Sequence, residues 1–332
     1  MSNKRLSLIL RIGAYLLVIG ALFLVFRKNS GAIADSLRAV SPLFLLMILS
    51  LELVYQFFDG CAYYVLLKPE WPDLTLPACL PLSWLEIFGR VATASAGSFP
   101  LQLSYLARYG ADWAVGLGLL TIHYIFQKAS ILIYAALVLF ACFLTRSSLT
   151  GDTVEAAVLW AGFLLTAVII AGLVLLLTGK LGFRHLVARL LGLIPARGVW
   201  KERKSAWILR LNDLYMASDR VFRRPLVILE AILLHLLKLS AMYAITWFCL
   251  RGIGIGTLSF FRSVGLTAIM QLLTGVLPSV SGLGSTEVSY LYIFSPILGA
   301  GTAASVMFLF RIATYFFPFL ASIGVFLKNR PQ

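Results

Sequence analysis

Long apolar runs, separated by short polar segments, recur along the whole chain. Each run has roughly the 20 residues that a helix needs to cross the hydrocarbon core of a bilayer. The short alternating segments that a membrane barrel would need are absent from the sequence. The pattern therefore predicts six membrane-spanning helices, at residues 8–26, 42–67, 117–143, 155–178, 226–250 and 302–327.

Two more apolar segments, 79–108 and 263–298, are each interrupted by glycine, serine and proline. Each segment therefore has two short arms around a break. Lipid cannot hydrogen-bond the free backbone groups of a break, so the breaks must face protein or water. We expect two re-entrant hairpins or broken helices. The residues that mark the breaks are Gly97, Pro100, Pro278, Gly282 and Gly284.

The composition indicates one all-helical transmembrane domain over residues 1–332. The chain is 60% hydrophobic and 13% charged, and its mean hydropathy is +0.92. No segment is left for a separate soluble catalytic domain. The four cysteines lack CxxC spacing, and the three histidines form no HxxxH or HExxH pattern. We therefore expect neither a metal ion nor another cofactor.

The excess of basic residues sets the expected orientation. The net charge is +14, and the loop 179–225 holds eleven Lys and Arg residues against three acids. Basic loops stay in the cytoplasm and are attracted to anionic headgroups, so nucleic acid is not an expected partner. An amphipathic stretch of this loop is expected on the membrane surface. Both termini then fall in the cytoplasm, although three cations in the loop 27–41 fall outside.

This topology sends the two broken segments into the membrane from opposite sides, each with one full span before it and one after it. The chain divides into a first half, 1–178, the cytoplasmic loop and a second half, 226–332. Within these halves, residues 42–143 and 226–327 are expected to form inverted repeats, an arrangement that many transporters use.

A shift of the chain by 185 residues places "GSFPLQLSYL" over "GLGSTEVSYL". The shift aligns Gln102 with Glu287 and Glu86 with Gln271, so each pair combines one carboxylate and one amide. Chance similarity is the alternative explanation, because glycine, serine, tyrosine and leucine are common in membrane helices. We favour a repeat, since the two segments enter the membrane from opposite sides whatever letters they share.

Ionisable side chains are frequent inside the predicted spans and broken segments. Each costs at least ~2.5–3.5 kcal/mol to insert, so such groups usually face a bundle interior or a cavity. They are Glu52, Asp59, Glu86, Arg90, His123, Lys128, Glu230, His235, Lys238, Glu287 and Arg311. Glu86 and Arg90, four residues apart, can pair on one helix face. Asp59 lies toward one end of its span, and His235 and Lys238 share a face with the nearest acid on their helix only approximately.

Glu287 and Arg311 are harder to explain by local pairing. Glu287 opens a helical arm after a glycine-rich break, where the helix dipole favours a carboxylate. An unpaired Arg311 in the last span would be costly, and Glu287 is its natural partner. Three roles stay open for Glu287: a helix cap, an ion-pair partner and a headgroup ligand. Lys128 and His123 occupy the equivalent span of the first half, where His123 either permits proton coupling or is a satisfied interior histidine.

The late segment "LPSVSGLGSTE" and the last span "FLFRIATYFFP" resemble the lysylphosphatidylglycerol synthase transmembrane, or flippase-like, family. This is the membrane part of the multiple peptide resistance factor and its stand-alone relatives. The residues that carry the resemblance are Pro278, Gly282, Gly284, Glu287, Arg311 and Pro318. The chain departs from the family at Val280 and Ser281, where Pro-Gly is common. It also departs in "FPLQLSYLAR", which keeps Pro100 and Arg108 but lacks the family's Gly-Glu.

The resemblance implies a multi-pass protein of the bacterial plasma membrane with a place in lipid metabolism and antibiotic resistance. It implies flipping of a phospholipid or lipid-linked headgroup, such as an aminoacylated phosphatidylglycerol, by alternating access between the repeats. The substrate-binding residues expected are Glu287 and Gln102 for a polar or cationic headgroup, Arg311, Arg90 and Lys128 for phosphate, and Glu86 and Gln271 beside them.

Two other functions stay open. In full-length relatives a separate soluble domain transfers lysine to phosphatidylglycerol. One alternative is therefore a lipid-modifying enzyme of the phosphatidylglycerol lysyltransferase type, although this chain lacks that soluble domain. The other is a membrane scaffold for a separate synthase or glycosyltransferase, docked on the basic loop. The partners considered are therefore a membrane lipid, such a synthase or glycosyltransferase, and a second copy of the chain.

Overall fold

The computed structural model describes residues 40–93, 97–145, 156–178, 215–275, 277 and 282–329. The secondary structure of these residues is helical, and they contain no strand. The predicted first span, 8–26, and most of the basic loop lie outside the described residues.

Four helices of the described part are long and apolar enough to cross a membrane. They are α3 (Pro42–Leu67), α6 (Trp113–Thr145), α10 (Pro225–Gly252) and the continuous helix Ala300–Lys328, made of α13 (Ala300–Arg311), a π-helical turn (Ile312–Phe316) and α14 (Phe317–Lys328). They confirm helices at four of the predicted spans. A further apolar helix, α7 (Ala156–Thr178), lies at the fifth. Pro42 and Pro225 begin their helices, where a fixed φ and a missing N–H do no harm.

Both interrupted segments form two short helices around a break. The helices are α4 (Leu76–Ala92) and α5 (Ser98–Leu106) in the first segment, and α11 (Phe260–Thr274) and α12 (Ser285–Leu298) in the second. Before α12, Gly282 and Gly284 have φ angles of 82° and 97°. Glycine adopts this left-handed conformation without the steric penalty of a side chain. Pro278 lies outside the described residues, and Pro100 lies in the first turn of α5, where a missing N–H is tolerated.

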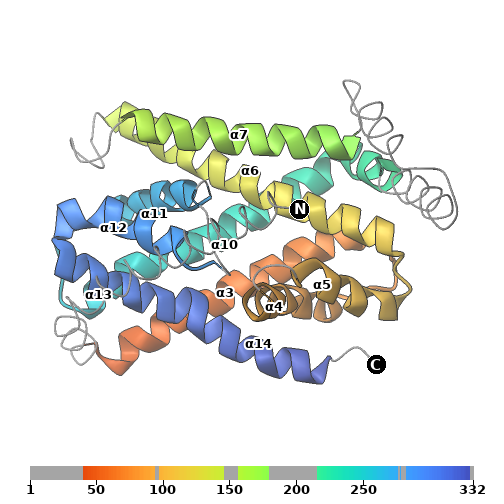
Figure 1. The fold of residues 1–332 in the computed structure, drawn as a ribbon, viewed down its shortest axis with the longest axis horizontal. Helices are drawn as coiled ribbons and strands as arrows, with labels where there is room; N and C mark the ends of the chain where they lie inside the picture. Colours follow the sequence, from red (N-terminus) through yellow and green to blue (C-terminus); the bar gives the residue numbers. More distant parts are fainter. Residues whose placement is uncertain are drawn as a thin grey trace, which may run out of the picture.

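Each half contains one long helix, then two short helices, then another long helix. Adding 185 to the bounds of α3 and α4 gives 227–252 and 261–277, close to the observed α10 at Pro225–Gly252 and α11 at Phe260–Thr274. Figure 1 shows the pair α4–α5 and the pair α11–α12 toward opposite ends of the long helices. The central long helices, α3 and α10, pack along each other.

Each short helix pair is surrounded by its own hydrophobic core. One core includes Tyr63, Leu66 and Leu82, and the other includes Tyr290 and Phe310. The helices α3 and α10 contribute side chains to both cores. This central crossing therefore joins the two helix pairs and fixes where the breaks lie relative to each other.

The close approach of α4 and α5 depends on a glycine. A Cβ atom on Gly89 would lie 2.7 Å from the backbone of Gly97 and 2.7 Å from the Cα of Ser98. These are backbone atoms, so no side-chain rotation can relieve the clash. The residue at position 89 must therefore stay without a side chain if the first broken segment is to fold back on itself.

We expect Gly89→Ala to destabilise the protein by about 1–3 kcal/mol, as overpacking does in close-packed interiors. The measurement is the thermal unfolding midpoint of the purified protein in detergent. Gly172→Ala in α7 is the matched control, because a Cβ there meets no atom within 4 Å. Equal midpoints for the two variants would contradict the close approach of α4 and α5.

Candidate functional site

Glu287 lies buried at the start of α12 and has two partners. Its Oε2 accepts a hydrogen bond of 2.7 Å from the backbone N–H of Gly284, and its Oε1 lies 2.8 Å from Nε of Arg311. The structure therefore combines two of the roles that the sequence left open, the cap and the ion pair. The carboxylate holds the N-terminus of α12 against the last membrane span.

Arg311, on α13, contacts both Glu287 and the glycine-rich break before α12. It ends α13, where the helix passes into the π-helical turn. Its Nη2 donates to the carbonyl of Gly282 at 2.8 Å, and its guanidinium lies 4.4 Å from the centre of the Tyr315 ring. Single π-helical turns inside α-helices occur often at functional sites. Arg311 therefore fixes the C-terminal end of the second break.

Lys128, on α6, lies at the N-terminal end of the same break. Its ammonium lies close to Gly275. A Cβ atom placed on Gly275 would be 3.5 Å from Nζ of Lys128 and 3.9 Å from the carbonyl oxygen of Gln271. The ammonium also lies 5.5 Å from the centre of the Tyr124 ring. A cation of the first half and a cation of the second half thus flank the stretch between Gly275 and Gly282.

Arg90 brings a third cation from the end of α4, next to the first break. Its Nη1 lies 3.7 Å from Oε1 of Glu86, which confirms the predicted i,i+4 pair. The side chains of Arg90 and Glu86 are 37% and 25% exposed. Arg90 is also within electrostatic reach of both Lys128 and Arg311. Three cations from three helices therefore gather at the breaks.

Gln102 lies behind Glu86. It is fully buried, and its Nε2 donates to the hydroxyl of Tyr63 at 2.8 Å and to the carbonyl of Leu82 at 3.0 Å. The hydroxyl of Tyr63 in turn donates to Oε2 of Glu86 at 3.0 Å. Gln102 thus connects α5 to α3 and α4, and its contact with a headgroup stays a prediction.

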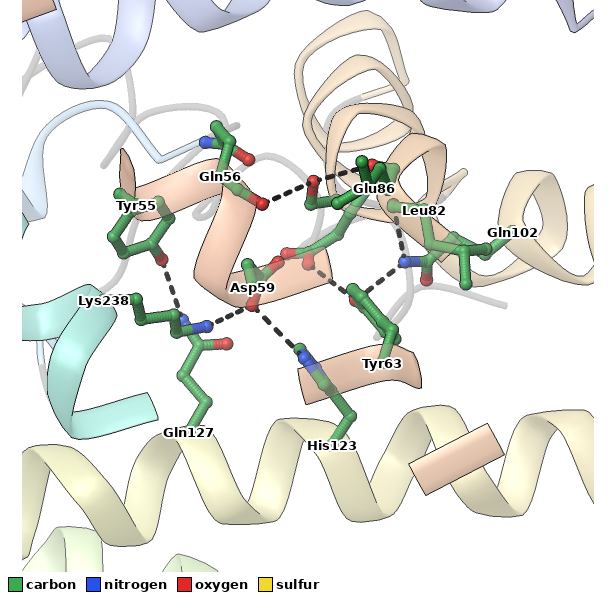
Figure 2. Close-up of polar contacts among 12 residues, drawn as sticks. Tyr55, Gln56, Asp59, Tyr63, Leu82, Glu86, Gln102, His123, Gln127 and Lys238 are labelled. Atoms are coloured by element: carbon green, nitrogen blue, oxygen red, sulfur yellow. Dashed lines mark hydrogen bonds and ion pairs between the residues drawn. The ribbon is translucent and has the colours of Figure 1, made fainter. Parts of the chain in front are cut away.

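A second polar cluster, which spacing did not predict, lies buried between α3, α6 and α10 (Figure 2). Lys238 forms an ion pair with Oδ1 of Asp59, and Nε2 of His123 lies 3.2 Å from the same oxygen. The ring of His235 lies 4.7 Å from the ring of His123. The partner of Lys238 is therefore on α3, 179 residues away in sequence, and not on its own helix.

Asp59, His123 and His235 carry the donor types that metal ions use, and their ligand atoms lie within 4.8 Å of one another. The ammonium of Lys238, however, already pairs with the carboxylate of Asp59. A divalent ion would have to displace this ammonium. The geometry therefore fits a charge-neutral ion pair with two imidazoles beside it better than a metal centre.

We expect Arg311→Met to cost about 3–5 kcal/mol of stability, because it leaves Glu287 buried without its counter-charge. Thermal unfolding in detergent measures the loss. The double variant Glu287→Gln and Arg311→Met should regain part of it, since no unpaired charge remains. Arg223→Met is the control, because it breaks an exposed pair with Asp219 that is worth about 0–1 kcal/mol. Equal losses for Arg311→Met and Arg223→Met would contradict a buried pair.

Comparison with known protein families places the chain in one of them. The family described as the lysylphosphatidylglycerol synthase TM region matches residues 11–322. No curated protein matches the chain significantly. The match covers both broken segments, the cations at their breaks and the long helices except the end of the last one. The chain therefore belongs to the lysylphosphatidylglycerol synthase transmembrane-region family, a family of multi-pass membrane proteins.

Proposed function

We propose that the protein moves a phospholipid or lipid-linked molecule between the two leaflets of the membrane. The observation that carries this proposal is the gathering of Arg90, Lys128 and Arg311 at the breaks of the two broken segments. Arginine and lysine are the side chains that bind phosphate most strongly. Cations at membrane depth are costly and usually mark a substrate pathway.

Two of these cations are open to a ligand. Arg90 and Lys128 are partly exposed, whereas Arg311 is buried and held by Glu287 and Gly282. We therefore assign the headgroup phosphate to Arg90 and Lys128. Arg311 keeps the second break in place and adds positive potential to the site. Glu86, partly exposed beside Arg90, is the acid that a cationic group on the same headgroup would reach.

The family match supports a lipid of this chemistry. The family is named for lysylphosphatidylglycerol, a lipid with one phosphate and a cationic aminoacyl group. Such a headgroup complements two cations and one carboxylate placed side by side. An aminoacylated phosphatidylglycerol is therefore the substrate that we propose first.

The contacts between helices support alternating access between two inverted repeats. The helix α4 of the first half packs against α14 of the second half. The corresponding helices of the other half do the same, because α11 of the second half packs against α6 of the first. The helices α3 and α10 pack against each other, as two equivalent helices of inverted repeats would. Rocking of two such halves about a shared centre can open a central site to one side at a time.

The test is transfer of lysylphosphatidylglycerol and of phosphatidylglycerol, each with a fluorescent acyl chain, between leaflets of proteoliposomes. We expect Arg90→Ala and Lys128→Ala each to lower the initial rate at limiting lipid about tenfold or more. A charge-assisted hydrogen bond contributes about 1.5–3 kcal/mol, and about 1.4 kcal/mol corresponds to a factor of ten. Arg223→Ala removes an exposed cation and is the matched control.

Two outcomes would contradict the proposal. One is a wild-type rate no higher than that of protein-free liposomes. The other is a rate unchanged in the double variant Arg90→Ala and Lys128→Ala, which would overturn the site assignment. Mass spectrometry of the same lipids shows whether a modified product forms, which the lipid-modifying alternative requires and translocation does not.

A further inference from the structure

The buried cluster of Asp59, His123, His235 and Lys238 has no role in the headgroup site described above. Each of these residues is at most 3% exposed. They come from three long helices, so their contacts join α3 and α6 of the first half to α10 of the second. Four ionisable groups inside a bilayer cost free energy to insert, and such groups usually mark a functional pathway. A purely structural role does not explain all four.

The ring of His235 makes no hydrogen bond within the cluster. Both ring nitrogens of His235 are buried without a hydrogen-bond partner among the described residues. A buried donor or acceptor that makes no hydrogen bond costs about 1–3 kcal/mol. The ring lies edge-on to His123, with 4.7 Å between the two ring centres. His235 is therefore an unsatisfied proton acceptor beside a second imidazole.

The charges of the cluster leave room for one proton. Asp59 and Lys238 neutralise each other as an ion pair. Nε2 of His123 lies 3.2 Å from Oδ1 of Asp59, and the imidazole becomes a cation when both of its ring nitrogens carry a proton. The resulting cation would face the carboxylate of Asp59 on one side. On the other side it would face the ring of Tyr63, which stacks on His123 with 3.6 Å between the ring centres.

Besides Tyr63, the titratable groups near the cluster include three others of the described residues. Tyr55, on α3, lies with its ring 5.2 Å from Nζ of Lys238. Glu52, also on α3, is buried and accepts a hydrogen bond from Gln56 at 2.7 Å. Glu86, on α4, meets the cluster only through the hydroxyl of Tyr63. Glu86 is therefore the only one of the three that also belongs to the headgroup site.

Tyr63 and Glu86 connect the cluster to the headgroup site (Figure 2). The ring of Tyr63 covers His123, and its hydroxyl donates to one oxygen of Glu86 at 3.0 Å. The other oxygen of Glu86 lies 3.7 Å from Arg90. A positive charge on His123 attracts Glu86 toward Tyr63 and away from Arg90. Arg90 is then freer to bind phosphate.

We propose that Asp59, His123, His235 and Lys238 form a proton-binding site inside the membrane, and that proton uptake there drives lipid movement. The proposal rests on the proposed lipid transport and names its driving ion. One proton enters from one side, resides on the imidazoles, and leaves to the other side as the halves rock. Because binding of two ligands is reciprocally linked, phosphate binding at Arg90 favours the protonated cluster in return.

The test uses proteoliposomes with a fluorescent phosphatidylglycerol, a trapped pH indicator and an imposed pH gradient of about two units. In the wild type we expect the gradient to change the initial rate of lipid transfer about tenfold or more, the size of an ordinary coupling energy. Lipid transfer should also be accompanied by proton movement. His123→Gln should move lipid at a rate that no longer depends on the gradient. His185→Gln removes a histidine of the basic loop and should behave as the wild type.

Tyr63→Phe tests the coupling between the proton site and the headgroup site without disturbing the fold. It keeps the ring over His123 and removes only the hydroxyl that contacts Glu86. This variant should lose the dependence of lipid transfer on the gradient. In detergent, however, a pH jump from 8 to 5 should load it with as many protons as the wild type. His123→Gln should take up about one proton fewer.

The outcomes separate this proposal from the proposed function. Wild-type lipid transfer that is independent of the gradient and moves no protons overturns the proton site and leaves translocation standing. Absence of lipid transfer overturns the proposed function, and the pH jump in detergent then decides the proton site alone. Equal proton uptake by the wild type and His123→Gln overturns it, as does zinc binding by the wild type that His123→Gln abolishes.

Discussion

The hydrocarbon of a bilayer offers no partner for a charge or a free backbone group, and this constraint determines where the polar groups of the protein lie. Each group at membrane depth must find its partner in the protein. Glu287 meets both Gly284 and Arg311, and Asp59 meets Lys238. The exceptions are informative, because Arg90 and Lys128 stay partly exposed at the breaks. Cations that the fold leaves partly exposed are the basis for proposing a site for an anionic headgroup.

Features that depend on neighbouring residues could be predicted from the sequence. The apolar runs predicted the long helices α3, α6 and α10, because a span requires a continuous apolar stretch. The glycines around Glu287 predicted the second break, since backbone angles such as those of Gly282 and Gly284 favour glycine. The i,i+4 spacing predicted the pair of Glu86 and Arg90, because these positions share one helix face.

Contacts between distant helices could not be predicted in this way. The pairing of Asp59 with Lys238 depends on how α3 and α10 are rotated about their own axes, and spacing along one helix carries no information on that rotation. The same reason explains why His235 and Lys238 had no assigned partner. Gln102 matched Glu287 in the aligned letters, yet its amide is held by Tyr63 and Leu82. The available signal was the presence of ionisable residues inside three spans, which indicates a buried cluster without naming its pairs.

We propose above all that the two breaks, one in each half, open alternately to the two sides of the membrane. The direct measurement is the labelling of Leu277→Cys, in a chain whose four native cysteines are replaced, by a membrane-impermeant thiol reagent. Leu277 lies in the second break and is 38% exposed. In vesicles of known orientation, we expect labelling from either side, and slower labelling when phosphatidylglycerol occupies the site. Labelling from one side alone, with and without added lipid, would contradict alternating access.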